Sequence, residues 1–188
     1  MSSCFGRYFR LSLFGQSHGP GVGVTLDGFP AGLEIDMEDV ARQMARRAPG
    51  QSALTTPRKE SDLPEILSGV FRGKTTGQPL TCLIRNENTR SQDYGEQVDL
   101  PRPGHGDYTG HVRYYGFEDF RGGGHFSARL TAPLVFAGAL CRQYLTGQGI
   151  SAVCHIQQLE NIRDKSFLDA VEPGDTPAEA LPTLTLPT

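Results

Sequence analysis

Two histidines stand in short, glycine-framed turns where an imidazole could transfer a proton. Gly15-Gln16-Ser17-His18-Gly19 follows an apolar run, and Arg102-Pro103-Gly104-His105-Gly106 lies near the middle of the chain. Imidazole changes charge near neutral pH, which makes histidine a frequent general acid or base. Arg102 adds a cation beside His105, and a bound anion favours the protonated ring. We expect an active site for an anionic substrate, with His18 as the first candidate for the proton donor.

A third segment, from Arg121 to Arg129, could bind the anion. It contains three consecutive glycines and leads directly into a long apolar helix pattern. Glycines let backbone N–H groups approach a ligand closely, and helix N-termini attract anions. Arg129 would add a charge-assisted contact from the first helical turn. For a glycine run taken alone, a flexible linker is the alternative interpretation.

Ser17 raises a different possibility, because G-x-S-x-G is also the nucleophile elbow of serine hydrolases. That elbow needs a helix directly after the turn. Here Pro20-Gly21-Val22-Gly23-Val24 follows, which favours a strand. We therefore give Ser17 a supporting role in the site and keep a serine hydrolase as the alternative.

Composition limits the class of protein. The chain has 188 residues, 37% hydrophobic residues and a net charge of -3, which indicates a globular protein and disfavours a nucleic-acid binder. No apolar stretch approaches ~18 residues and no secretory signal pattern begins the chain, so we expect a cytoplasmic protein without a membrane segment. The four cysteines lack zinc-binding spacing, and no metal site is predicted.

The elements that must position these residues are mostly short. Strands are expected at Phe5–Phe14 and Val22–Leu26, as an antiparallel hairpin whose tip is the GQSHG turn. Asp36 is expected to cap a helix over 37–47, which Pro49-Gly50 ends. Two further strands are predicted at Ile66–Phe71 and Leu80–Ile84.

The second half of the chain is less regular. Residues 86–124 lack apolar periodicity but contain six aromatic residues, which predicts an ordered active-site loop. The strongest helix pattern covers Ser127 to about Thr146, and a strand is expected at Ile150–Ile156. We treat 1–188 as one domain, with an irregular Pro/Thr-rich tail at 173–188.

Several motifs in order along the chain closely resemble the chorismate synthase family. They run from Phe5 to about Ala152, and the most specific are FGQSHGP, RRAPG, LSGVF, TTG, RSQDY, RPGHGDYT and RGGGHFSARLTA. The resemblance implies an α+β fold, a β-α-β sandwich in which antiparallel sheets pack on long helices. This chain resembles the N-terminal part of that fold.

The resemblance also implies a reaction. Members of the family are lyases that convert 5-enolpyruvylshikimate 3-phosphate to chorismate and phosphate by trans-1,4-elimination. This is the last common step of the shikimate pathway, which leads to the aromatic amino acids. The reaction requires reduced FMN without net redox change, and either NADPH or an external supply keeps the flavin reduced. The full-length protein is expected to be a homotetramer.

By the same resemblance, residues of the three segments acquire roles. His18 and His105 match the catalytic histidines, with Ser17 beside them; one histidine serves the departing phosphate and the other the flavin, and we favour His18 for phosphate. The substrate-binding arginines match Arg47, Arg102 and Arg129. The flavin-contacting segment matches His125, Phe126 and Ser127, and Arg47 also matches a nicotinamide-binding position.

Some positions differ from the common family pattern. Gln16 replaces a glutamate, Leu130 replaces another, and Ala48 and Ala53 replace arginines, which leaves fewer cations for the substrate. The residues His125-Phe126 replace Arg-Ser after the glycines. Family members are also roughly twice as long, and their second half supplies further flavin contacts and a catalytic aspartate. We therefore expect an N-terminal fragment or truncated product, and a non-catalytic remnant is the second interpretation.

Overall fold

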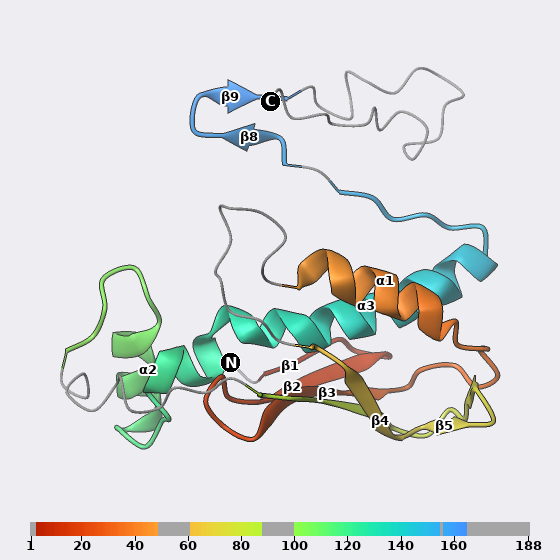
Figure 1. Ribbon diagram of the computed structural model, residues 1–188, viewed down its shortest axis with the longest axis horizontal. Coiled ribbons are helices and arrows are strands. Elements are labelled where there is room, and N and C mark those ends of the chain that lie inside the picture. Colours follow the sequence, from red (N-terminus) through yellow and green to blue (C-terminus); the bar gives the residue numbers. More distant parts are fainter. Residues whose placement is uncertain (1–2, 49–60, 88–99, 155, 165–188) are drawn as a thin grey trace. The chain divides into compact units, whose positions relative to one another are not determined.

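The computed structural model describes residues 3–48, 61–87, 100–154 and 156–164 (Figure 1). Two compact units divide the chain, one covering Met1–Gln143 and the other Tyr144–Thr188, and each is described by itself. The predicted helix stop at Pro49-Gly50, Ala53, the RSQDY motif and the tail at 173–188 lie outside the described residues.

A five-stranded antiparallel sheet with the order β1-β2-β3-β7-β4 forms the centre of the first unit. The predicted hairpin is confirmed: β2 (Arg10–Gly15) pairs with β3 (Gly21–Asp27), and the GQSHG turn forms its tip. Val22, Val24 and Leu26 of β3 are fully buried on one face. The alternation of the sequence therefore sets which face of the sheet meets the core.

The predicted strand at Phe5–Phe14 is in fact two strands. β1 (Cys4–Phe5) turns back at Gly6 and pairs antiparallel with β2. Gly6 has φ of 96°, and a Cβ there would lie 1.8 Å from the carbonyl oxygen of Phe9. A tight turn at Gly6 therefore separates the two strands. The apolar alternation does not reveal this turn, because it continues across it.

Glycine also interrupts the predicted strand at Ile66–Phe71. β4 (Pro64–Ser68) ends at Gly69, and β5 (Val70–Phe71) pairs instead with β6 (Lys74–Thr75) in a small separate sheet. The other predicted strand is confirmed as β7 (Leu80–Arg85), with Leu80, Cys82 and Ile84 buried on one face. β7 lies between β3 and β4.

The first helix, α1 (Met37–Arg47), has the predicted bounds. Its cap is also as predicted, since the Asp36 side chain accepts a hydrogen bond of 2.9 Å from the backbone of Asp39. Asp39 is itself buried and accepts hydrogen bonds from Arg142 and Gln143 of α3. A first-turn carboxylate thus joins the two helices that cover one face of the sheet (Figure 1).

The long helix begins later than expected. Ser127 caps a short 3-10 turn, η3 (Ala128–Leu130), and the regular helix α3 follows at Thr131–Gly147. Pro133 lies in the first turn of α3, where a missing N–H is tolerated. Phe136 and Leu140 are fully buried.

The region expected to be a loop contains a helix that the sequence did not reveal. α2 (Asp107–Tyr114) begins just after His105, and Tyr115 ends it in a left-handed conformation with φ of 56°. Its weak apolar periodicity explains the omission, because only Gly110 of this helix is buried. The glycine triplet follows within the 3-10 segment η2 (Arg121–Phe126).

Among the described residues of the second unit, β8 (Gln158–Leu159) pairs with β9 (Ile162–Arg163) in a short hairpin. The strand predicted at Ile150–Ile156 is wrong, since the described residues of that stretch form no helix or strand. Among the described residues, no helix is both long and apolar enough to cross a membrane. The α+β class is confirmed by the antiparallel sheet and its covering helices.

The different burial of the cysteines predicts how fast their thiols react. The Cys82 side chain is fully buried in the sheet, and this burial raises its pKa to about 12, whereas Cys4 and Cys154 are exposed. Because the thiolate is the nucleophile, a thiol reagent at pH 8 should modify Cys4 and Cys154 quickly and Cys82 only after unfolding. Peptide mass spectrometry with and without urea measures this. Rapid labelling of Cys82 in the folded chain would contradict its placement.

Candidate functional site

The three predicted segments meet at the end of the β2–β3 hairpin. The backbone N–H of Ser17 donates to the Gly124 carbonyl at 3.1 Å. The ring of His125 donates from Nδ1 to the Gly15 carbonyl at 2.9 Å. These contacts join the hairpin tip to the glycine triplet across more than 100 residues of sequence.

The rings of both predicted catalytic histidines pack against the glycine triplet, on the backbone of Gly122 and Gly123, which we call the glycine floor. A Cβ at Gly122 would lie 2.1 Å from His18 Cε1, and a Cβ at Gly123 would lie 2.7 Å from His105 Nε2. Both glycines have positive φ, of 57° and 90°, which other residues adopt only with strain. Glycine is therefore required here twice over, for the backbone conformation and for the space that the imidazoles occupy.

Ser17 is almost completely buried beside His18. Its hydroxyl lies 3.3 Å from the carbonyl of Arg121 and 3.2 Å from that of Gly122, and each carbonyl can only accept. The remaining contact, 3.1 Å from Ser17 Oγ to His18 Nδ1, is then a hydrogen bond that His18 donates. A hydroxyl held in this way orients the imidazole, and it is badly placed to act as a nucleophile.

His105 lies in a second, charged arrangement. Its Nδ1 is 2.6 Å from Asp107 Oδ1. Arg102 donates to both oxygens of the same carboxylate, at 2.7 and 2.8 Å. These Arg102 hydrogen bonds hold the pKa of Asp107 well below its usual range, so the carboxylate stays ionised. The Asp119–Arg121 pair repeats the pattern, with the pKa of Asp119 lowered by the hydrogen bonds from Arg121.

The other two predicted substrate arginines meet at one buried carboxylate. Arg47 and Arg129 each form an ion pair with Asp62, one to each oxygen. The Asp62 side chain is only 1% exposed, and that of Arg129 only 5%. The group carries one net positive charge, because one carboxylate faces two guanidinium groups.

Asn86 connects this charged group to the histidine turn. Its side chain accepts from Arg129 Nε at 3.0 Å and donates to the carbonyls of Gln16 and Gly19, at 2.9 and 2.8 Å. Asp62, Arg129 and Asn86 thus form one chain of contacts that ends on both sides of His18. The sequence offered no signal for Asp62, and Asn86 was recognisable only as the residue directly after a buried strand.

The predicted cofactor segment divides into different environments. Both ring nitrogens of His125 have partners, the Gly15 carbonyl and, at 2.6 Å, the hydroxyl of Ser3. The Ser127 hydroxyl caps η3 by accepting a hydrogen bond from the backbone N–H of Arg129. This N–H is one of those that we expected from the sequence to bind an anion, and it already has a partner within the chain. Phe126 differs, since its partly exposed ring packs over Gly106 and Gly110 and lines a cavity.

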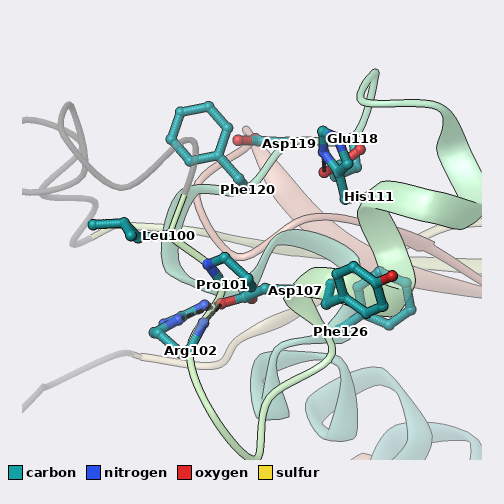
Figure 2. A pocket seen from close by; sticks show the side chains of 11 residues that line it. Leu100, Pro101, Arg102, Asp107, His111, Glu118, Asp119, Phe120 and Phe126 are labelled. Carbon is teal, nitrogen blue, oxygen red and sulfur yellow. Dashed lines mark hydrogen bonds and ion pairs between the residues drawn. The ribbon is translucent and has the colours of Figure 1, made fainter.

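This cavity has a volume of about 300 Å³ (Figure 2). Figure 2 shows Arg102 and Asp107 on one side, with His111 and Glu118 on another and Phe120 and Phe126 as aromatic walls. Gly123 also lines it, so it extends to the glycine beneath His105. The Glu118 Oε2 atom is buried without a hydrogen-bond partner among the described residues. The cavity therefore combines aromatic walls, a cation and an unpaired acceptor, which are typical features of small-molecule sites.

Comparison with known proteins identifies the family. The chorismate synthase family model matches residues 9–181. The chain belongs to the chorismate synthase family. It is 48% identical over 180 residues to the chorismate synthase of Phocaeicola vulgatus, covering 93% of this chain and 50% of that relative. With the chorismate synthase of Chitinophaga pinensis it shares 51% identity over 160 residues, covering 85% of this chain and 48% of the relative.

A solved structure agrees with the sequence relatives. A chorismate synthase crystal structure matches 76% of this chain with 32% identity and a TM-score of 0.51, and the match covers 36% of that chain. The present chain spans about half the length of the chorismate synthases it matches. The predicted family is thus confirmed, and the observed sheet and helices match part of the chorismate synthase structure.

The glycine floor generates a prediction. Gly122→Ala should displace the His18 ring, because the new methyl group would overlap Cε1 and Nδ1. Gly73→Ala is the matched control, since Gly73 also has positive φ but nothing lies within 4 Å of a Cβ there. Each variant should lose about 1–3 kcal/mol of unfolding free energy through backbone strain. Only Gly122→Ala should shift the imidazole NMR signals of His18, and unchanged signals in the folded variant would contradict the overlap.

The buried carboxylate of Asp62 leads to a second prediction, about stability. Asp62→Ala removes the carboxylate that two guanidinium groups share, one of them deeply buried, and should lower the unfolding free energy by about 3–5 kcal/mol. Glu65→Ala removes an exposed carboxylate that pairs with Arg85, and should cost far less. Urea unfolding of the two variants measures the difference. Equal losses would show that Asp62 does not stabilise the arginine pair.

Proposed function

We propose that this chain supplies the proton-transfer residues for the elimination of phosphate from 5-enolpyruvylshikimate 3-phosphate, the reaction that gives chorismate. The observation that carries the proposal is the placement of His18 and His105 on the neighbouring glycines Gly122 and Gly123, of which Gly123 also lines a cavity. Family membership supports the reaction, and the geometry supports the roles of the two histidines.

The substrate carries two carboxylates and a phosphate, so positive charge is needed to bind it. Arg102 lines the cavity together with three carboxylates, those of Asp107, Glu118 and Asp119, and the excess positive charge comes from the Arg47–Asp62–Arg129 group. Charge-assisted contacts from arginine recognise both carboxylate and phosphate. We propose Arg102 as the first contact of the substrate, with Arg47 and Arg129 contributing when an anionic group competes with Asp62 for their donors.

The elimination removes a hydrogen from one carbon and breaks a carbon–oxygen bond to phosphate at another. A proton delivered to the departing phosphate lowers the cost of its negative charge. We propose His18 for this delivery, with Ser17 orienting its ring through Nδ1. We propose His105 as the second proton-transfer residue; its Nε2 lies against Gly123, which lines the cavity.

Reduced FMN is the cofactor of the proposed reaction, and when bound it lends electron density to the substrate and receives it back. The cavity fits a flat ring with N–H groups, since Phe120 and Phe126 form walls and Glu118 offers a buried, unpartnered oxygen. We propose that Phe126 contacts the ring. His125 and Ser127 would support the segment rather than face the cofactor, because both are used in contacts within the chain.

Several further statements are proposals about the complete protein. We propose a cytoplasmic homotetramer without membrane or nucleic-acid partners, and NADPH, contacting Arg47, as one source of reducing equivalents. A non-catalytic remnant is the second interpretation; the chain spans about half the length of each relative. The serine hydrolase alternative loses support because Ser17 is buried and faces two carbonyls.

Phosphate release under anaerobic conditions tests the proposed function. The chain is supplied with reduced FMN and substrate, and oxidised FMN serves as the control. We expect phosphate and chorismate only with the reduced flavin, and His105→Ala should lower kcat about 10²-fold or more with a much smaller effect on substrate binding. Replacing chemically reduced FMN by FMN with NADPH tests the nicotinamide proposal.

Three outcomes separate the interpretations. Absence of both phosphate release and any substrate-dependent change in flavin absorbance would leave only the remnant. Unchanged turnover in His105→Ala would remove His105 from the mechanism. Labelling of Ser17 by a fluorophosphonate probe would restore the hydrolase alternative.

A further inference from the structure

Asp107 is a residue to which the family resemblance gave no role, although it lies in the RPGHGDYT motif. It is the first residue of α2, so the helix fixes its backbone two residues after His105. Its carboxylate receives three hydrogen bonds from Arg102, two from the guanidinium group and one of 3.0 Å from the backbone N–H. The side chain is therefore held on both oxygens before any contact with histidine is counted.

The contact with histidine determines where a proton must lie. His105 Nδ1 and Asp107 Oδ1 are 2.6 Å apart, too close for two atoms that both present lone pairs. Arg102 keeps the carboxylate ionised, so the shared proton belongs to Nδ1. Arg102 Nη2 is 3.4 Å from Nδ1 and could donate to that nitrogen only if Nδ1 carried no proton. The carboxylate oxygen is much closer to Nδ1, at 2.6 Å, and therefore decides the assignment.

We infer that Asp107 is the positioning residue that holds His105 with its proton on Nδ1, so that Nε2 is the nitrogen that exchanges a proton with the ligand. This inference rests on the proposed role of His105 as a proton donor. A Cβ built on Gly123 would lie 2.7 Å from Nε2, and Gly123 is one of the residues that line the cavity. When doubly protonated His105 gives up its Nε2 proton, the N–H bond breaks, the ligand receives the proton, and neutral imidazole remains with Nδ1–H bonded to Asp107.

The arrangement differs from that of His18, whose Nδ1 donates to an uncharged hydroxyl. An ionised carboxylate stabilises an imidazolium as well as one tautomer of the neutral ring, whereas a hydroxyl only orients the ring. The two histidines are thus oriented through the same nitrogen by partners of different charge. Arg102 acts on His105 through Asp107, in addition to its position in the cavity wall.

Imidazole NMR of the 15N-labelled chain tests the inference without requiring turnover. Two-bond 1H–15N correlation spectra distinguish neutral rings with Nδ1–H from those with Nε2–H, and a His105→Gln variant assigns the signal. We expect neutral His105 to carry Nδ1–H in the wild type and to lose that pattern in Asp107→Ala. Glu65→Ala, which breaks an exposed carboxylate–arginine pair without a histidine, should leave the His105 signal unchanged.

A wild-type spectrum with the proton on Nε2 overturns the inference, and so does a folded Asp107→Ala variant that keeps Nδ1–H. The wild-type measurement decides alone if Asp107→Ala does not fold, because Asp107 also begins α2. Absence of phosphate release together with the expected tautomer would reject the proposed function and leave the positioning role of Asp107 intact.

Discussion

The close approach of the backbone at Gly122 and Gly123 is the constraint on which the rest of the site depends. A floor without side chains allows two imidazoles from distant segments to lie on neighbouring peptide units. The positive φ angles turn the chain so that it returns to the hairpin tip, where Gly124 accepts from Ser17. Any larger residue would separate the histidines and strain the turn together, so geometry and chemistry impose the same requirement on these positions.

Charge is arranged in layers around this floor. The nearest arginines bind carboxylates within a few residues, as in Arg102 with Asp107 and Arg121 with Asp119. The deeper pair, Arg47 and Arg129, shares Asp62. Internal carboxylates hold the guanidinium groups in place and reduce the repulsion among them, while the deeper group retains one net positive charge.

Local signals in the sequence were sufficient for elements whose residues interact mainly with near neighbours. The helix cap at Asp36 and the apolar alternation in β3 and β7 lie within the elements that they predict, and those predictions are confirmed. The Phe5–Phe14 and Ile66–Phe71 strands were too long because the turns at Gly6 and Gly69 do not change the apolar pattern. α2 was missed because it buries almost nothing, and the strand at 150–156 was wrong because apolar residues there found no pairing partner within the described residues. The motifs indicated which segments meet, but Asp62 and Asn86 act only through contacts between segments, which no local pattern encodes.

The contacts that complete the site join very distant parts of the chain. His125 reaches Gly15 across 110 residues, and Arg129 reaches Asp62 across 67. Closing such loops costs conformational entropy before the contacts can repay it, so local hairpins and helices form more easily than these long-range pairs. The proximity of His18 and His105 is therefore a property of the completed fold, and a defect in any of these distant segments would separate the two imidazoles.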